Sequence, residues 1–321
     1  MAGFDVITVG RVSVDLYPEQ IDVPLPEVAT FTKSLGGSAT NVAVATASLG
    51  TRATVITKVG DDPFGDYIRR ALERFGVDPR FVSTDPKLRT PLAFCEIHPP
   101  DSFPILFYRE PKAPDMNLSY ADMPLEEIVD CQLFWTTGTG LSDEPSRSAT
   151  LAALEARART AHIAQKGWIT VHDLDHRPAL WESEDDARAL AAEAVRNATV
   201  VIGNTEEVEM ATGIADPFDA SSALLEMGAR VAIVKRGGEG VLARTATGEV
   251  IEVPAVEVSV KNGLGAGDAF GGALCHALVS GWELERALRF ANAAGAIVAS
   301  RMLCADDMPT TGEVEDLLAA A

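Results

Sequence analysis

Short apolar runs typical of buried strands alternate with helical stretches along most of this chain of 321 residues. The predicted strands cover residues 6–9, 53–59, 132–136, 168–171, 199–202 and 231–234. The predicted helices cover residues 38–49, 63–75, 145–165 and 186–197. This alternation favours a mostly parallel central sheet with helices on both faces. Because no Gly/Ser-rich linker interrupts the pattern, we expect residues 1–321 to form a single α/β domain.

Two segments break this alternation. Residues 12–33 are strand-like, contain prolines and show no helical pattern. Residues 91–112 are typical of a hairpin, with strands at 92–97 and 105–109 around the turn Pro99-Pro100-Asp101. We interpret the two segments as a small β lid on the main domain. The alternative is a pair of edge hairpins with no moving part.

The segment 262–272, Asn-Gly-Leu-Gly-Ala-Gly-Asp-Ala-Phe-Gly-Gly, is the most informative motif. It lies between a β-rich stretch at 250–260 and a small-residue helix at about 269–280. Its glycines allow backbone amides to approach a ligand, and amides at a helix start favour negative charge. With Asp268 beside them, they suit transfer of a phosphoryl group to a hydroxyl whose proton the carboxylate accepts. The alternative is an ordinary turn in which Asp268 caps a helix.

Other polar residues follow predicted strands, where ligand sites of open α/β sheets gather. Asp15 follows the first strand, and Gly36 and Gly37 precede a helix that carries Asn41 about one turn in. Carboxylate and amide groups can bind the hydroxyls of a polyol, and paired glycines allow close backbone approach. The alternatives are a loop carboxylate, a turn and a surface amide.

Two later strand ends carry further candidates. Asn204 and Glu207 could hold metal-bound water near phosphates, or they could form an ordinary helix N-terminus. Lys235 opens the basic, glycine-containing loop 235–240, which suits either a nucleotide phosphate or a hairpin turn.

Arg109, on the proposed lid, and Arg177, after a predicted strand, are candidate carboxylate-binding residues. Arginine pairs with carboxylates through two parallel hydrogen bonds, so both residues near a polyol site would indicate an acidic sugar. The alternative is that they form surface ion pairs with Glu110 and Asp175.

The composition and the missing motifs argue against several classes of function. The 27 Lys and Arg residues face 47 Asp and Glu, giving a net charge of −20, which argues against nucleic acid or an anionic membrane as the main partner. The sequence has no apolar run of about 18 residues, so no membrane span is expected. P-loop, dinucleotide-binding and serine-hydrolase motifs are also missing. Four widely spaced cysteines are typical of reduced thiols in the cytoplasm: Cys95, Cys131, Cys275 and Cys304.

Together these features resemble the ribokinase-like (PfkB-type) carbohydrate kinases over nearly the whole chain. The motifs that carry the resemblance are, in order, Gly10 with Asp15, the run Gly36-Gly37-Ser38-Ala39-Thr40-Asn41, Asn204 with Glu207, Gly237 with Gly240, and Gly265-Ala266-Gly267-Asp268. The resemblance implies a ribokinase-like three-layer sandwich that uses ATP and Mg²⁺ to phosphorylate a sugar.

Within this family the chain is most similar to the sugar-acid kinases of myo-inositol breakdown, over residues 10–18, 35–44, 60–65, 173–181 and 262–274. That similarity implies 5-dehydro-2-deoxygluconate as the substrate and its 6-phosphate as the product. The alternatives within the class are 2-keto-3-deoxygluconate, fructose and ribose. The alternative from another class is a pseudokinase that binds a sugar without turning it over.

The family pattern also implies a role for each matching residue. Asp268 is expected to be the catalytic base, with an anion hole formed by Gly265, Ala266 and Gly267. The residues expected at the sugar are Asp15, Gly36, Gly37 and Asn41 for hydroxyls, and Arg109 and Arg177 for the acid end. Those expected at ATP are Asn204, Lys235, Gly237, Gly240 and Asn292, with Asn204 and Glu207 ordering Mg²⁺ through water.

Two positions depart from the family pattern. Asn262-Gly263 stands where many members have Asp-Thr, which removes a carboxylate and leaves K⁺ only as an additional candidate cofactor. Lys235 stands where the family often has Thr. A homodimer formed through the lid is a further expectation from the resemblance.

Overall fold

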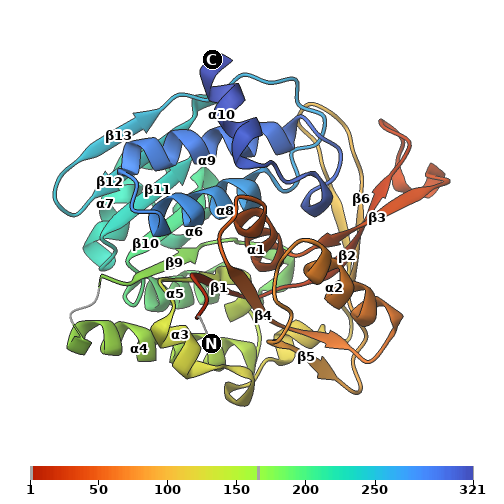
Figure 1. The fold of residues 1–321 in the computed structure, drawn as a ribbon, viewed down its shortest axis with the longest axis horizontal. Helices are drawn as coiled ribbons and strands as arrows, with labels where there is room; N and C mark the ends of the chain where they lie inside the picture. Colours follow the sequence, from red (N-terminus) through yellow and green to blue (C-terminus); the bar gives the residue numbers. More distant parts are fainter. Residues whose placement is uncertain (1–2, 165–166, 321) are drawn as a thin grey trace.

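A computed structural model describes residues 3–164 and 167–320 of the chain. Within these ranges, nine strands form one large sheet (Figure 1). In order across the sheet they are β13 (Val250–Val253), β12 (Val241–Thr245), β11 (Val231–Lys235), β10 (Val200–Asn204), β9 (Ile169–Asp173), β8 (Leu133–Thr137), β1 (Val6–Val9), β4 (Ala53–Gly60) and β5 (Val82–Asp85). From β11 to β5 all neighbours are parallel, whereas β12 and β13 are antiparallel.

The sheet is buried on both faces, as its apolar strands require. In β1, Val6 packs into one hydrophobic cluster, whereas Ile7 and Val9 pack into the cluster on the opposite face. Successive side chains of a strand point to opposite faces, so a strand covered on both sides must be apolar throughout. This explains why the parallel strands are visible in the sequence as short continuous apolar runs.

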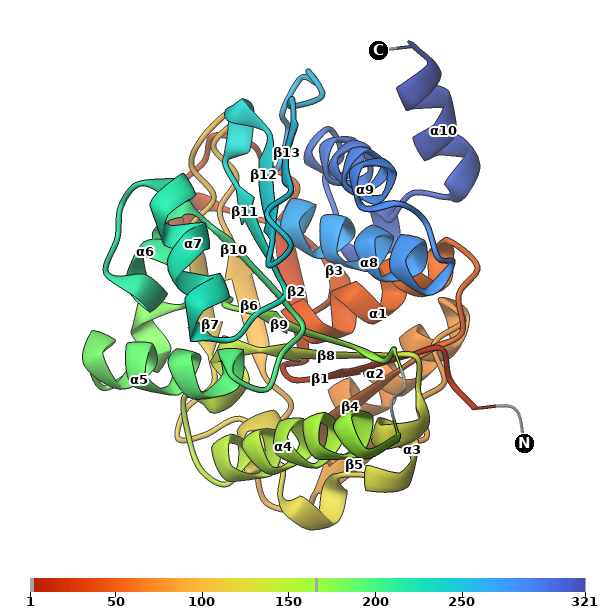
Figure 2. The ribbon, with the colours of Figure 1, turned by 90° about the vertical axis from the view of Figure 1, so that its left-hand side faces the viewer.

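Helices form a layer on each face of the sheet (Figure 2). One layer holds α1 (Ser38–Ser48), α2 (Pro63–Arg74), α8 (Ala266–Val279) and α9 (Leu284–Ala299), with α10 (Thr311–Ala320) packed on α9. The other holds α3 (Leu125–Asp130), α4 (Ser146–Ala164), α5 (Glu184–Val195), α6 (Thr205–Thr212) and α7 (Pro217–Met227). The chain therefore has the α/β three-layer architecture that the sequence predicts.

Side-chain caps fix where helices begin. The Asp62 carboxylate accepts hydrogen bonds from the amides of Phe64 and Gly65, each 3.0 Å long, and Pro63 occupies the first helical position of α2. A cap of this kind satisfies amides that have no partner inside the helix. The predicted start of α2 is therefore confirmed.

A separate four-stranded sheet, the small sheet, is built from the two segments that break the alternation. Its order is β3 (Phe31–Gly36), β2 (Ser13–Pro18), β6 (Leu92–Cys95) and β7 (Ile105–Tyr108). Each segment forms an antiparallel hairpin, and the parallel pairing of β2 with β6 joins the two hairpins. The two segments therefore form one small sheet separate from the main sheet, and its movement as a lid stays a prediction.

Several predicted boundaries shift. The helix expected at 269–280 begins three residues earlier, at Ala266, and only 250–253 of the β-rich stretch 250–260 forms a strand. The last residue of the helix predicted at 145–165 lies outside the described residues.

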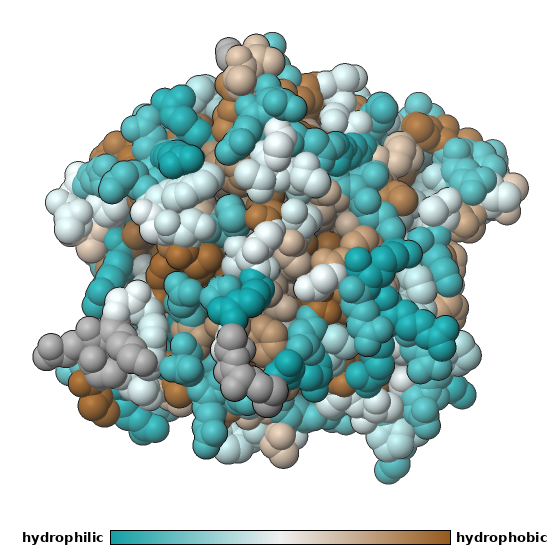
Figure 3. All heavy atoms as spheres, viewed as in Figure 1, coloured by the Kyte–Doolittle hydropathy of each residue, from teal (hydrophilic) through white to brown (hydrophobic). Residues whose placement is uncertain are grey.

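The surface is mixed in polarity. Hydrophilic and apolar residues are interspersed over the face shown in Figure 3. Among the described residues, the longest and most apolar helices still fall short of what a membrane crossing needs.

Candidate active site

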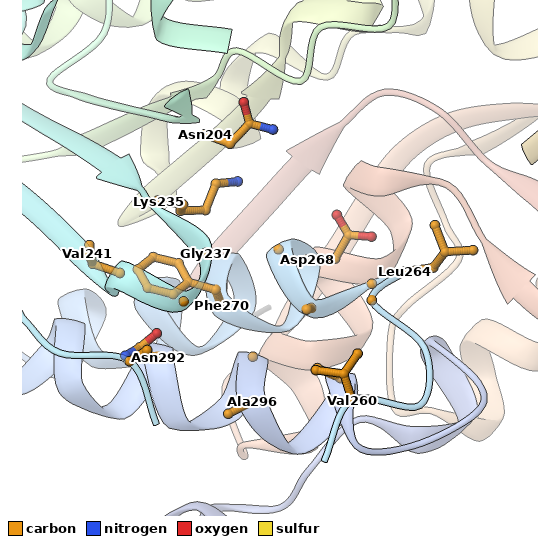
Figure 4. A pocket seen from close by; sticks show the side chains of 18 of the residues that line it. Asn204, Lys235, Gly237, Val241, Val260, Leu264, Asp268, Phe270, Asn292 and Ala296 are labelled. Atoms are coloured by element: carbon orange, nitrogen blue, oxygen red, sulfur yellow. The ribbon is translucent and has the colours of Figure 1, made fainter. Parts of the chain in front are cut away.

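Three neighbouring strands of the main sheet end in polar side chains. Asp173 ends β9, Asn204 ends β10 and Lys235 ends β11, and the last two are direct partners in the register. Carboxyl ends of parallel strands meet at one edge of a sheet, where such folds bind ligands. These side chains line a cavity of about 670 Å³, the large cavity, together with the start of α8, part of α9 and the loop 255–260 (Figure 4).

A second cavity of about 80 Å³, the small cavity, lies against the small sheet. The small sheet lines it with Ser13, Asp15, Tyr17, Ala93, Ile105 and Phe107. Five residues line both cavities: Ser38, Arg177, Leu264, Gly265 and Asp268. Asp268 therefore stands where the two cavities meet.

Asp268 lies in the first turn of α8 but does not cap it. Gly265 is the N-cap residue, and the Asp268 carboxylate instead accepts a 2.8 Å hydrogen bond from Asn41 Nδ2. Burial raises the pKa of Asp268 to about 6, which the Asn41 hydrogen bond opposes and the nearby Asp175 carboxylate reinforces. The interpretation of Asp268 as a helix cap is wrong, and Asp268 instead lines both cavities.

The amides around Asp268 are arranged to meet an anion. Within the described residues, no hydrogen bond is formed by the backbone N–H groups of Gly267 and Asp268, which lie in the first turn of α8. Amides at a helix start attract negative charge.

Gly265 occupies a backbone conformation and a space that suit only glycine. Its φ is +82°, and a Cβ atom there would lie 2.1 Å from Cys304 Sγ. This close approach of Gly265 to Cys304 holds the turn before α8 in place.

At the other end of the small cavity, Asp15 is held against the backbone of Gly36. The Asp15 carboxylate accepts a 2.6 Å hydrogen bond from Ser13 Oγ, and a Cβ on Gly36 would lie about 2.0 Å from Asp15 Oδ2. Burial raises the pKa of Asp15 to about 6, partly offset by the Ser13 hydrogen bond and by Arg11. Asn41 completes this wall with a buried Oδ1 that has no hydrogen-bond partner among the described residues.

A cluster of charges lies between the cavities. Asp175 accepts hydrogen bonds from Arg11 Nη2 at 3.1 and 3.3 Å and from Thr139 Oγ1 at 2.7 Å. Arg177 Nη2 lies 3.1 Å from Asp175, and its Nη1 lies 3.5 Å from Glu207. Burial alone would raise the pKa of Asp175, but Arg11 and Arg177 outweigh it and hold the pKa below its usual range. Arg177 therefore pairs with Asp175, as the alternative interpretation predicts, but Asp175 is buried and the pair is not a surface ion pair.

Lys235 provides a cation at the large cavity. Its Nζ lies 4.0 Å from Asp173 Oδ1 and beside Gly267 of the first α8 turn. Burial drives the pKa of Asp173 well above its usual range, with Lys235 opposing and Glu207 reinforcing the shift. Burial alone would lower the pKa of Lys235, but the surrounding carboxylates raise it, so the lysine stays charged.

Asn204 and Glu207 form a capping box at the start of α6. Asn204 Oδ1 accepts from the Glu207 amide at 2.8 Å, and Glu207 Oε2 accepts from the Asn204 amide at 2.7 Å. The interpretation as a helix N-terminus is therefore confirmed, and both residues also line the large cavity. Among the described residues, no group of three or more His, Cys, Asp or Glu side chains could hold a metal ion.

The loop after β11 is a hairpin turn to β12, as one of its two interpretations predicts. Gly237 and Gly240 of this turn line the large cavity, as does Asn292 of α9, whose Nδ2 donates to the Pro254 carbonyl at 2.7 Å (Figure 4). The hairpin turn between β11 and β12 therefore also forms part of the wall of the large cavity.

Asn262 has a structural role beside this site. Its Nδ2 donates to the Met302 carbonyl at 2.8 Å, and its Oδ1 accepts from the Leu264 amide at 3.0 Å. Both ends of the amide are therefore used to hold the turn that leads to Gly265.

Arg109 lies outside both cavities. Its guanidinium forms a buried ion pair with Asp115 rather than the expected pair with Glu110, and the other Asp115 oxygen accepts from the Val12 amide at 2.9 Å. The prediction that Arg109 meets the acid end of a sugar gains no support from this geometry, because Arg109 lines neither cavity.

Several lining residues are missing from the sequence prediction. They are Arg11, Phe103, Phe107, Asp173, Asp175, Cys304 and the loop 255–260. Arg11, Asp173 and Asp175 directly follow or end strands, so the rule that sites gather at strand ends could have found them. The aromatic residues and the loop reach the cavities only through tertiary packing.

The chain is similar to known proteins in its sequence and in its fold. The model of the pfkB family carbohydrate kinases matches residues 4–311. A 5-dehydro-2-deoxygluconokinase of Geobacillus thermodenitrificans (strain NG80-2) is 33% identical over 319 residues, covering 98% of this chain and 93% of that protein.

Solved structures share the fold. A fructokinase with bound ATP from Xylella fastidiosa superposes with a TM-score of 0.85 at 25% identity, covering 98% of each chain. A putative ribokinase II in complex with ATP and Mg²⁺ from E. coli gives a TM-score of 0.87 at 24% identity, covering 99% of this chain and 100% of that one.

Proposed function

Because this chain belongs to the pfkB family of carbohydrate kinases, we propose that it phosphorylates 5-dehydro-2-deoxygluconate with ATP to give the 6-phosphate, as in myo-inositol catabolism. The observation that carries the proposal is the position of Asp268 and the free amides beside it, where the large and small cavities meet. The sugar acid is assigned from the curated relative of that name, which aligns over nearly the full length of both chains.

The chemistry follows from what surrounds Asp268. The substrate hydroxyl oxygen attacks the γ-phosphorus, the bond from that phosphorus to the β–γ bridging oxygen breaks, and the hydroxyl proton passes to the Asp268 carboxylate. With a pKa of about 6, this carboxylate is still ionised at neutral pH yet more basic than an ordinary aspartate. The amides of the first α8 turn and Lys235 oppose the negative charge on the transferring group.

ATP is proposed to occupy the large cavity, whose volume of about 670 Å³ lies within the usual range for ligand sites. Gly237, Gly240 and Asn292 would line its nucleoside end, and Lys235 its phosphates. Mg²⁺ usually binds phosphates, water and only one or two carboxylates, which the donor set of Asn204, Glu207 and Asp173 fits. When bound with ATP, it would neutralise phosphate charge. K⁺ is the additional candidate cofactor.

The sugar is proposed to occupy the small cavity. The unpartnered Asn41 Oδ1 can accept a hydroxyl hydrogen, as can the Asp15 carboxylate, while Gly36 and Gly37 shape the wall. Arg177 would meet the acid end. The small sheet would act as a lid that excludes water, which competes with the sugar as phosphoryl acceptor.

The test of this function is ADP release with Mg²⁺ and ATP across a panel of acceptors. The panel contains 5-dehydro-2-deoxygluconate, 2-keto-3-deoxygluconate, fructose, ribose and a blank without sugar. A kcat/KM clearly highest for the first supports the proposal. A preference for another member keeps the kinase and discards the substrate, and sugar binding without ADP release indicates a pseudokinase.

Asn204→Ala should separate the capping role of Asn204 from its role at ATP. Loss of the cap should lower the free energy of unfolding by about 1 kcal/mol, measured by urea denaturation. If Asn204 also contacts ATP, the KM for ATP should rise. Ser183→Ala is the matched control, because Ser183 caps α5 through the Asp186 amide and lines neither cavity. It should lose similar stability with an unchanged KM, and equal KM values in the two variants would remove Asn204 from the ATP site.

The proposal extends to assembly and location. Leu106 and Tyr108 on β7 are 48% and 59% exposed, and Tyr108 packs edge-on against Phe94 with ring centroids 5.3 Å apart. We propose that this outer face of the small sheet pairs two copies, which light scattering should show as a dimer that Tyr108→Asp weakens. A mass of one chain for the wild type would contradict it.

The proposed location is the cytoplasm, in keeping with four buried, unpaired cysteines.

A further inference from the structure

The small cavity contains an arginine other than the two that the sequence singles out. Arg11 and Arg177 line it, whereas Arg109 does not. Arg11 comes directly after Gly10, where the chain leaves β1 for the small sheet, so it reaches the cavity from the main body of the molecule.

Arg11 is fixed by contacts that leave one end of its guanidinium unused. The residue is only 6% exposed, its Nε donates to Thr139 Oγ1 at 2.9 Å, and its Nη2 donates to Asp175. In the described part of the chain, Nη1 has no hydrogen-bond partner, and it is not fully buried. Nη1 is therefore a donor at the small cavity that can bind an acceptor supplied by a ligand.

The surroundings favour a carboxylate as that acceptor. Asp175 pairs with both Arg11 and Arg177, so the two guanidinium groups are held together at one cavity. Their side chains are therefore already ordered before a ligand binds. The Phe107 ring of β7 lies 5.9 Å from Arg11 Cζ and lines the same cavity. An aromatic cover excludes water and strengthens a charged hydrogen bond beneath it.

We propose that Arg11 determines the specificity for a sugar acid: its Nη1 donates to the carboxylate of the substrate, with Arg177 as the second donor. This inference rests on the proposed function, since it presumes that the substrate carries a carboxylate. It replaces Arg109 by Arg11 at the acid end. Arg177 is 41% exposed along its side chain and lines both cavities, whereas Arg11 lines only the small cavity.

The test compares two substrates that differ in one group: 5-dehydro-2-deoxygluconate, with a charged carboxylate, and its neutral carboxamide. In Arg11→Met, kcat/KM for the acid should fall about 10²-fold, and that for the carboxamide by less than about threefold, because only the acid loses a charged partner. Arg11→Lys keeps the charge and the link to Asp175 but not the planar fork, and it should recover part of the preference for the acid. The lysine variant keeps the test decisive if the methionine variant unfolds.

Arg109→Met is the matched control. It also removes a buried, ion-paired arginine, but one that lines neither cavity, so any loss should be the same for the acid and the carboxamide.

Equal losses for both substrates in Arg11→Met would show that Arg11 only holds Asp175 and Thr139, and would overturn the inference. A wild-type enzyme that treats the acid and the carboxamide alike would instead contradict the proposed sugar-acid substrate. Calorimetry of the acid binding to the wild type without ATP separates these cases. Binding that weakens about 10²-fold in Arg11→Met supports the inference even if turnover is slow.

Discussion

Asp268→Asn should lower kcat by about 10²–10⁴-fold, the usual contribution of a positioned base. An amide cannot accept the proton of the attacking hydroxyl, but its oxygen can still accept the hydrogen bond from Asn41 Nδ2, so the local structure is kept. The measurement is ADP release at saturating ATP and sugar acid, with calorimetry showing that ATP still binds.

Asp62→Asn is the control for this change. Asp62 caps α2 outside both cavities, and asparagine caps a helix as well as aspartate does, so turnover should be unchanged. An Asp268→Asn enzyme with near-wild-type kcat would exclude Asp268 as the base.

The same role predicts the acidic limb of the pH profile. A raised pKa means that Asp268 is protonated at a higher pH than an ordinary aspartate, and the protonated form cannot accept a proton. The wild-type kcat/KM should therefore fall as the pH drops through about 6. Asp15 has a similar pKa, so the limb reports both carboxyls together. A profile that stays flat down to about pH 5 would contradict an essential ionised Asp268.

Gly265→Ala should strongly reduce turnover although glycine has no side chain to lose. A Cβ there would lie 2.1 Å from Cys304 Sγ, and φ of +82° is strained for alanine. The turn must shift, and the amides that follow would leave the position of the phosphoryl group. We expect kcat to fall by about 10²–10³-fold, as when an oxyanion donor is lost.

Gly267→Ala is the companion variant, because a Cβ there meets only Lys235 Nζ, at 3.4 Å, and its φ is not positive. It should lose much less activity than Gly265→Ala. Adding Cys304→Gly to Gly265→Ala frees the space but not the strained φ, so it should restore part of kcat. Equal losses in the two single variants would place the amides of this turn outside the reaction.

The sequence predicts the fold well where local rules apply. The buried strands are visible as apolar runs because both of their faces are covered, and α2 is visible because Asp62 and Pro63 mark its start. The prediction places the start of α8 three residues too late, because glycines such as Gly265 and Gly267 are poor helix formers and do not indicate a helix that begins at Ala266.

The candidate site is predictable only in part. Asp268, Asn41 and Asp15 stand out by motif, and the structure brings all three to the small cavity. The partners of the arginines are not set locally: Arg109 pairs with Asp115, and Arg11 pairs with Asp175 across a sequence separation of 164 residues. No spacing rule reports which carboxylate a guanidinium will reach in the folded chain.

The two interpretations of Asn204, as a helix cap and as an ATP-binding residue, are compatible with each other. A capping box and a ligand site use different atoms of the same turn, since the cap takes the side-chain oxygen of Asn204 while Nδ2 is not used by it.

Asp115 ties the small sheet to the main body at one buried point. One of its oxygens holds the Val12 amide where the chain enters the small sheet, and the other holds Arg109 where the chain leaves it. Two of the four passages between the main body and the small sheet are thus tied to one buried point, which would act as the pivot of the proposed lid. Parts of a rotating body travel in proportion to their distance from the pivot. Arg11, next to Val12, would therefore stay almost still while the tip of the hairpin around Pro99 sweeps the widest arc. The acid end of a ligand would be gripped in the same way in the open and closed states, and opening would mainly govern the path by which it enters.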